Sequence, residues 1–173
     1  MIPISSAISG GLVWSKTPFS CSYELKSNGE TVGSLRRTSF WTSEFRAESY
    51  HGSWRFRRSG CLRAGTEIID LTSSVAIAAL KPNWSGGGTL AFSADETYRI
   101  TSQGFWQPVW VVVGKGDRPV LSIHSGDKTV QLTDEWYPSE ARPILLAIFA
   151  WYLMKQAAED VSGFVAAAVA ATS

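Results

Sequence analysis

Short runs in which apolar and polar residues alternate occupy most of the chain between residues 21 and 133. A period of two is typical of strands that bury one face, and β-branched and aromatic residues fill many of the apolar positions. The pattern predicts strands at residues 22–26, 31–37, 44–50, 53–58, 67–71, 75–80, 89–93, 97–101, 109–113, 119–124 and 129–133.

Turn-forming residues separate these runs, and most connections are short. Ser27-Asn28-Gly29-Glu30 and His51-Gly52 have the composition of hairpin turns, as do Gly114-Lys115-Gly116-Asp117 and Ser125-Gly126-Asp127. Parallel neighbours would need crossover connections of a dozen or more residues. We therefore expect antiparallel neighbours and a mainly β fold.

The pattern changes after Pro138, and a helix is expected to begin at Pro143 and to extend to about residue 161. Proline suits the first helical position because its missing N–H would have no intrahelical partner there. Residues 144–154 are apolar around the whole circumference, so either lipid or protein must enclose them. The alanine-rich tail at residues 162–173 is compatible with a helical continuation and with disorder.

The length of this apolar segment separates lipid from protein as its surroundings. At ~1.5 Å per residue it covers ~16 Å, about half of the ~30 Å hydrocarbon layer, so we expect no transmembrane span. Enclosure by protein leaves only the strands, and an eleven-stranded can has room for a central helix. The sequence therefore predicts one domain over residues 1–173, a closed antiparallel β-barrel of about 11–12 strands around the hydrophobic C-terminal helix.

Composition and charge narrow the functional classes. The chain is 45% hydrophobic and 18% charged, as in packed globular proteins. Its net charge of +1 gives no global attraction to nucleic acid, which we do not expect as a partner. Cys21 and Cys61 are too few for a disulfide framework, and we expect both to be buried thiols. Residues 1–7 lack the features of a secretory signal, which favours a cytoplasmic location.

Spaced aromatic residues and glycines carry a further signal. They are Trp14, Cys21-Ser22-Tyr23-Glu24-Leu25, Gly33-Ser34-Leu35-Arg36, residues 52–60, Gly87-Gly88-Thr89-Leu90 and Ala150-Trp151-Tyr152-Leu153. Over nearly its whole length the chain resembles bacterial members of the tubby C-terminal-like superfamily, which includes the LURP-one-related and phospholipid scramblase domains. The resemblance implies a closed barrel around a hydrophobic C-terminal helix. It also implies contact with phosphoinositides or membranes, as tubby and scramblase domains show.

Catalytic and metal sites are not recognisable in the sequence. His51 and His124 lie beside expected turns or strand ends and outside any catalytic signature. Ser59-Gly60-Cys61 does not match a nucleophile elbow, and the glycines of residues 81–89 lack the Gly-Lys-Ser/Thr ending of a P-loop. We expect no cofactor, no metal and no enzymatic activity, and a wide loop at residues 81–89.

A basic strand is the best candidate for a binding site. Residues 36–63 hold seven Arg against two Glu. Alternation in Ser53-Trp54-Arg55-Phe56-Arg57 places Trp54 and Phe56 toward the core and the arginines outward. We expect a face for anionic headgroups that consists of Arg36, Arg55, Arg57 and Arg63, with Arg37 and Arg58 nearby.

Three functions remain open at this point. The first is a non-enzymatic binding or scaffolding domain that contacts anionic phospholipid at the membrane periphery. The second is a structural or protein-interaction module with an acidic protein partner, and the third is an enzyme with an unrecognised site.

Four tryptophans lie in or beside loops, and we expect them to pack over the barrel ends. They are Trp41, Trp84, Trp106 and Trp136.

Overall fold

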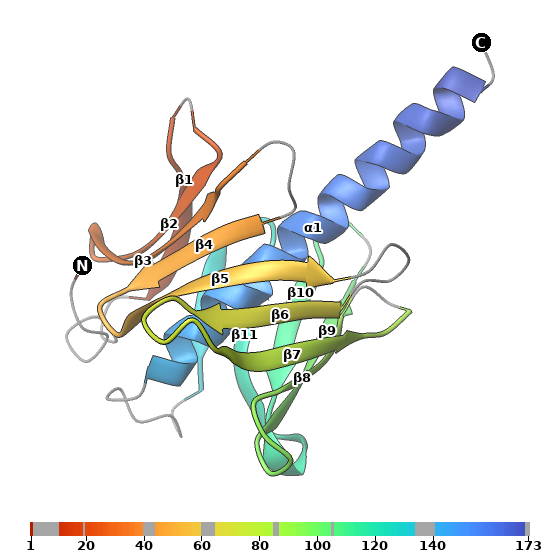
Figure 1. Cartoon of the computed structure of the whole chain (residues 1–173). Helices are drawn as coiled ribbons and strands as arrows, with labels where there is room; N and C mark the ends of the chain where they lie inside the picture. Colours follow the sequence, from red (N-terminus) through yellow and green to blue (C-terminus); the bar gives the residue numbers. More distant parts are fainter. Residues whose placement is uncertain are drawn as a thin grey trace.

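The structure is a computed structural model that describes residues 1, 11–18, 20–39, 44–59, 65–84, 87–104, 106–133 and 141–171, with helix side chains described as far as Asp160. Its strands form a closed antiparallel barrel around a C-terminal helix (Figure 1). The elements are β1 Leu12–Lys16, β2 Ser22–Ser27, β3 Glu30–Arg37, β4 Glu44–Ser49, β5 Gly52–Ser59, β6 Gly65–Asp70, β7 Ala76–Pro82, β8 Gly88–Ala91, β9 Thr97–Gln103, β10 Val109–Val113, a 3-10 turn Lys115–Asp117, β11 Pro119–His124, β12 Thr129–Leu132 and α1 Ala141–Ala171.

The predicted fold class is confirmed, and each of the eleven expected strands has a counterpart. The additional strand is β1, whose only local signal is the alternation around Leu12 and Trp14. It pairs with β2 through Trp14 and Leu25 and with β12 through Leu12 and Val130. β1 therefore closes the barrel by joining the beginning of the sheet to its end.

Two connections show why the sequence needs glycine. Asn28 and Gly29 have φ angles of 49° and 84°, the pair of positive values that a tight hairpin turn between β2 and β3 requires. Gly87 precedes β8, and a Cβ atom there would lie 2.0 Å from the carbonyl oxygen of Ile100 on β9. Gly87 thus lets the chain approach β9 at the start of β8.

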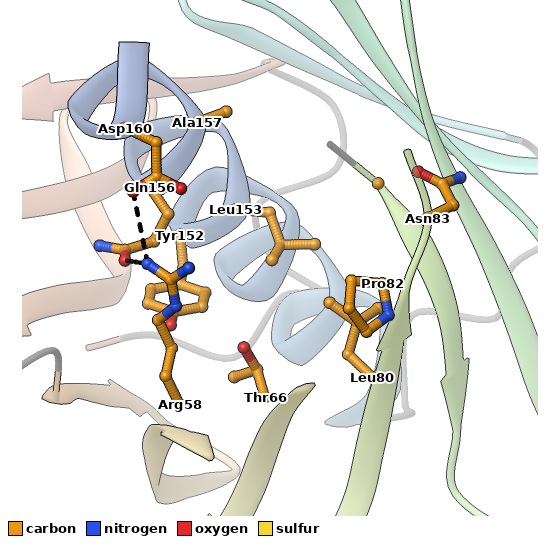
Figure 2. Close-up of a pocket in the computed structure, with 11 residues that line it drawn as sticks. Arg58, Thr66, Leu80, Pro82, Asn83, Tyr152, Leu153, Gln156, Ala157 and Asp160 are labelled. Carbon is orange, nitrogen blue, oxygen red and sulfur yellow. Dashed lines mark hydrogen bonds and ion pairs between the residues drawn. The ribbon is translucent and has the colours of Figure 1, made fainter. Parts of the chain in front are cut away.

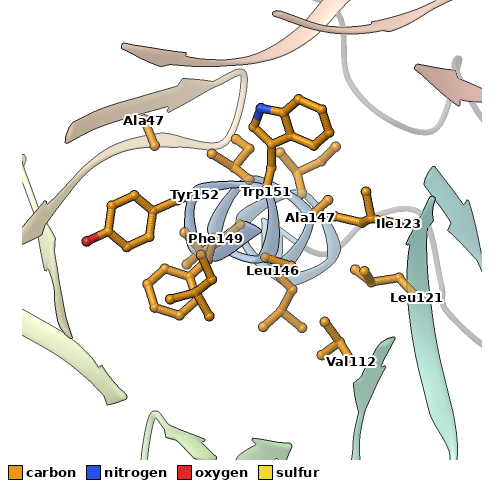
Figure 3. Packing of buried hydrophobic residues seen from close by; sticks show 14 of the residues in the cluster. Ala47, Val112, Leu121, Ile123, Leu146, Ala147, Phe149, Trp151 and Tyr152 are labelled. Atoms are coloured by element: carbon orange, nitrogen blue, oxygen red, sulfur yellow. The ribbon is translucent and has the colours of Figure 1, made fainter. Parts of the chain in front are cut away.

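The helix supplies the centre of the core. Every side chain from Ile144 to Met154 is between 0 and 7% exposed, although no strand alone could cover an apolar circumference. Figure 3 shows helix side chains that radiate in all directions toward the surrounding strands. Trp151 stacks on Trp14 with ring centroids 5.0 Å apart, and Phe149 meets Phe56 edge-on at 5.1 Å. Enclosure by the chain's own strands is confirmed.

The helix is longer than predicted at both ends. It begins at Ala141, so Pro143 lies in the first turn, where a missing N–H breaks no intrahelical bond. Arg142 anchors this end because it pairs with Glu96 at 2.7 Å and lies 3.7 Å above the Phe92 ring. At the other end the helix leaves the barrel and continues to Ala171 (Figure 1), so the tail is helical over residues 162–171.

No described helix has the length and apolar character of a membrane span.

Two expectations about exposure were wrong. Cys21 is exposed because it lies in the β1–β2 connection, whereas Cys61 falls outside the described residues. Trp84 and Trp106 are 86% and 91% exposed and do not pack over the barrel end. Trp41 and Trp136 also lie outside the described part of the chain.

The enclosed helix generates a stability prediction. Phe149→Asp places a carboxylate at a fully buried position among Phe56 and Tyr152, where ionisation is costly. We expect the free energy of unfolding to fall by about 3 kcal/mol or more in urea denaturation. Val75→Asp, at a position 58% exposed, is the control and should change it by less than about 0.5 kcal/mol. Equal stability of the two variants would contradict the enclosure.

Candidate functional site

Three arginines from neighbouring strands lie side by side on the outer face of the barrel. Arg36 on β3 is directly opposite Arg46 on β4, and Arg46 is directly opposite Arg55 on β5. Their chain neighbours Leu35, Phe45 and Phe56 are buried, so alternation turns the arginines outward. We call Arg36, Arg46 and Arg55 the arginine row.

Like charges directly opposite one another destabilise a sheet, so the row needs compensation. Arg46 has it, because its Nε lies 2.6 Å from Glu48 Oε1. Arg36 and Arg55 form no ion pair with any residue that the structure describes. The cationic row therefore keeps two guanidinium groups without a carboxylate partner in the described chain, and an anion from outside would stabilise it.

A cavity of about 250 Å³ lies beside the row. It is lined by Thr17, Ser22, Tyr23, Glu24, Ser34, Arg36, Arg46 and Glu48. Four of these residues carry hydroxyls and two carry guanidinium groups, all of which can donate hydrogen bonds to a phosphate group. Glu24 and Glu48 also line the cavity and repel a broad anionic surface. A compact anion that fits between the arginines is therefore favoured.

Two further arginines were expected in the same site, Arg57 and Arg63. Arg57 also faces outward, but it lies between Glu44 and Glu67 on the adjacent strands. Its Nη2 donates to Glu67 Oε2 at 2.8 Å, and this hydrogen bond raises the pKa of Arg57 above its usual value. Arg57 is thus already paired, and Arg63 falls outside the described residues.

Arg37 and Arg58 do not join the outward face, in contrast to our expectation. Each follows an outward arginine by one residue, so strand alternation turns it toward the helix. Arg37 Nη1 lies 3.4 Å from Glu159, and Arg58 Nη1 lies 3.1 Å from Gln156 Oε1 and 3.5 Å from Asp160 Oδ1. These contacts surround the helix where it leaves the barrel, which we call the barrel mouth.

A second cavity, of about 240 Å³, opens at the barrel mouth (Figure 2). Its lining comprises Arg58, Thr66, Leu80, Pro82, Asn83, Gly87, Tyr152, Leu153, Gln156, Ala157 and Asp160. Figure 2 shows Arg58 and the Tyr152 hydroxyl on one side, Leu80, Pro82 and Asn83 on the other, and Thr66 between them. We call this space the mouth cavity.

Several polar groups of the mouth cavity are buried. Thr66 and Gln156 are 3% and 7% exposed, and Tyr152 is fully buried. Desolvation raises the pKa of Tyr152, and the nearby Thr66 side chain opposes that rise. The Tyr152 hydroxyl forms no hydrogen bond of good geometry with any residue that the structure describes.

Lysines add positive charge on another side of the mouth. The Lys155 ammonium lies 4.5 Å from the Trp151 ring and 5.1 Å from the Tyr23 ring, which are cation–π distances. Burial lowers the pKa of Lys155, and the charges of Lys128 and Lys16 lower it further.

Metal-binding side chains do not converge in the described part of the chain. No three His, Cys, Asp or Glu residues there are placed to hold a metal ion. His51 lies in the β4–β5 turn and His124 at the end of β11, which strand direction puts at opposite ends of the barrel. The two histidines therefore belong to no common site.

Sequence reasoning missed Arg46 and the mouth cavity. Arg46 carried a usable signal, because Phe45 and Ala47 predict that it faces outward, and a His51-Gly52 turn places it opposite Arg55. The mouth cavity carried no such signal. It depends on how the helix is rotated inside the barrel, which brings Tyr152 next to Thr66 and Arg58.

Comparisons with protein-family models, with curated proteins and with solved structures yield no match to this chain. The resemblance to the tubby C-terminal-like superfamily stays a prediction. The site must therefore be interpreted from its own geometry.

The arginine row predicts opposite stability effects for two similar substitutions. Arg36→Gln removes like-charge repulsion and should raise the free energy of unfolding by roughly 0.2–1 kcal/mol at low salt. Arg57→Gln removes the Glu67 contact and should lower stability slightly. Urea denaturation at low and high salt measures both, and screening should shrink both effects. A loss of stability in Arg36→Gln at low salt would contradict the repulsion.

Proposed function

We propose that this chain is a non-enzymatic binding domain that contacts phosphate-bearing lipid headgroups through the arginine row, as a peripheral protein on the cytoplasmic membrane surface. The observation that carries the proposal is the direct alignment of Arg36, Arg46 and Arg55 across three strands. A phosphate monoester carries close to two negative charges and accepts several hydrogen bonds from guanidinium groups.

The charges around the row support a specific headgroup over diffuse attraction. Glu24 and Glu48 line the adjacent cavity, and Glu44 and Glu67 lie beside Arg57. These carboxylates repel a flat membrane surface whose lipid headgroups each carry a single negative charge. A compact, multiply charged phosphate can lie against the guanidinium groups of Arg36 and Arg46 at this cavity, so phosphoinositides fit better than phosphatidylserine.

A protein-interaction module is the second candidate, and two exposed tryptophans favour it. Trp84 and Trp106 lie in the β7–β8 and β9–β10 loops at the barrel mouth and are 86% and 91% exposed. Large exposed aromatic side chains are enriched where proteins associate. In this alternative an acidic protein would meet the arginine row and the loops would add apolar contact.

Liposome sedimentation tests the proposal. Wild-type protein should sediment with phosphatidylcholine vesicles that contain a phosphoinositide, more strongly than with phosphatidylserine vesicles of equal total charge. High salt should release it, because exposed charges are screened within ~8 Å at physiological ionic strength. Arg36→Gln with Arg55→Gln should lower the partition coefficient by roughly tenfold or more, since each surface cation contributes about 1 kcal/mol.

The matched control is Arg57→Gln with Arg99→Gln. It removes the same charge, but from arginines that already pair with Glu67 and Asp117 at 2.8 Å. We expect it to retain most of the binding. Failure of the wild type to sediment at low salt would reject the lipid proposal. Equal losses in the two double variants would show that binding depends only on net charge and not on the arginine row.

A further inference from the structure

We propose that the mouth cavity binds a small carboxylic acid with an apolar body. This site is separate from the arginine row, and the inference does not depend on the lipid proposal. Three observations carry it: a buried hydroxyl without a partner among the described residues, a weakly held acidic side chain, and an apolar part of the cavity lining.

The Tyr152 hydroxyl is the first observation. Nearly all buried polar groups in proteins have a hydrogen-bond partner, because an unsatisfied one costs about 1–3 kcal/mol. The Tyr152 side chain is 0% exposed, and its hydroxyl has no well-formed hydrogen bond to any of the described residues. It lines the cavity together with Thr66 and Arg58 (Figure 2). A ligand oxygen in the cavity would satisfy it.

The contact between Arg58 and Asp160 indicates that this ligand oxygen belongs to a carboxylate. The guanidinium already contacts a carboxylate oxygen of Asp160 and the amide oxygen of Gln156. Its distance to Asp160 is 3.5 Å, longer than the 2.7–3.2 Å of a well-formed N–H···O bond, and the Asp160 side chain is 62% exposed. A ligand carboxylate can therefore replace Asp160 and pair with Arg58 through two parallel hydrogen bonds.

The remaining lining limits the rest of the ligand. Leu80 is the cross-strand neighbour of Thr66 on β7, and with Pro82 and Leu153 it gives the cavity an apolar part (Figure 2). These apolar side chains suit a hydrocarbon group and offer inorganic phosphate no hydrogen-bond donor. The volume of about 240 Å³ is below the range of about 300–1,000 Å³ typical of drug-sized ligands. A monocarboxylic acid with a short chain or one ring is the class that fits.

Titration of the full chain with phenylacetate and with hexanoate tests the inference, with phenylacetamide, hexanamide and inorganic phosphate as comparison ligands. Two-dimensional amide NMR should show saturable shifts at Thr66 and near the end of β7 for at least one acid. The matching amide and phosphate should bind at least tenfold more weakly, because neither combines a carboxylate with an apolar group.

Three variants locate the site. Tyr152→Phe and Arg58→Gln should each weaken acid binding by about tenfold, which corresponds to about 1.4 kcal/mol. Asp160→Asn should strengthen it severalfold, because it removes a carboxylate that competes for Arg58. Tyr50→Phe, at an exposed hydroxyl in the β4–β5 turn at the opposite end, is the control and should leave binding unchanged.

Tyr152→Phe also separates ligand binding from a structural role. Without ligand this variant should be as stable as the wild type or more stable, because it removes an unsatisfied hydroxyl and keeps the ring. Binding of neither acid, or equal affinity for acid and amide, would overturn the inference. Unchanged acid affinity in both Tyr152→Phe and Arg58→Gln would overturn it as well.

Discussion

The packing of one apolar helix inside a sheet determines the rest of this structure. A helix without a polar face is stable in water only if other groups cover its entire circumference. A single sheet covers one side, so the sheet has to close, and closure requires β1 to pair with β12. The helix in turn fills an interior that twelve strands alone would leave too wide for their own side chains. Barrel and helix thus depend on each other for a core.

Closure also divides every strand into an inner and an outer series of residues. Inside, Trp14, Phe56 and their neighbours contact the helix. Outside, cross-strand register aligns Arg36, Arg46 and Arg55, which are ten and nine residues apart along the chain. Near the mouth the inner series becomes polar. There Arg37 and Arg58 contact the helix beyond its apolar segment, where Glu159 and Asp160 follow Met154. Both candidate sites follow from this alternation, one on each face.

The sequence contained the periodicities but not the registers. Period two identified the orientation of Trp54 and Phe56, and the apolar segment identified the enclosed helix, because both signals come from neighbouring residues. Arg57 was grouped with Arg55 on the same grounds, yet its pairing with Glu67 depends on the register of β5 against β6. The position of Tyr152 beside Thr66 depends on the rotation of the helix within the barrel. Such relations arise from the packed whole, so no local pattern specifies them.

The position of the helix in the chain has a consequence for biosynthesis. Translation produces all twelve strands before residues 141–171, so during most of synthesis the nascent sheet lacks the segment that fills its interior. Domains whose contacts are far apart in sequence fold slowly, and unpaired edges and exposed apolar faces invite aggregation in the meantime. This barrel can complete its core only after residues 144–154 have been made. Chaperones that hold the emerging strands, and any premature stop codon, would therefore affect its yield more strongly than that of a protein built around its N-terminus.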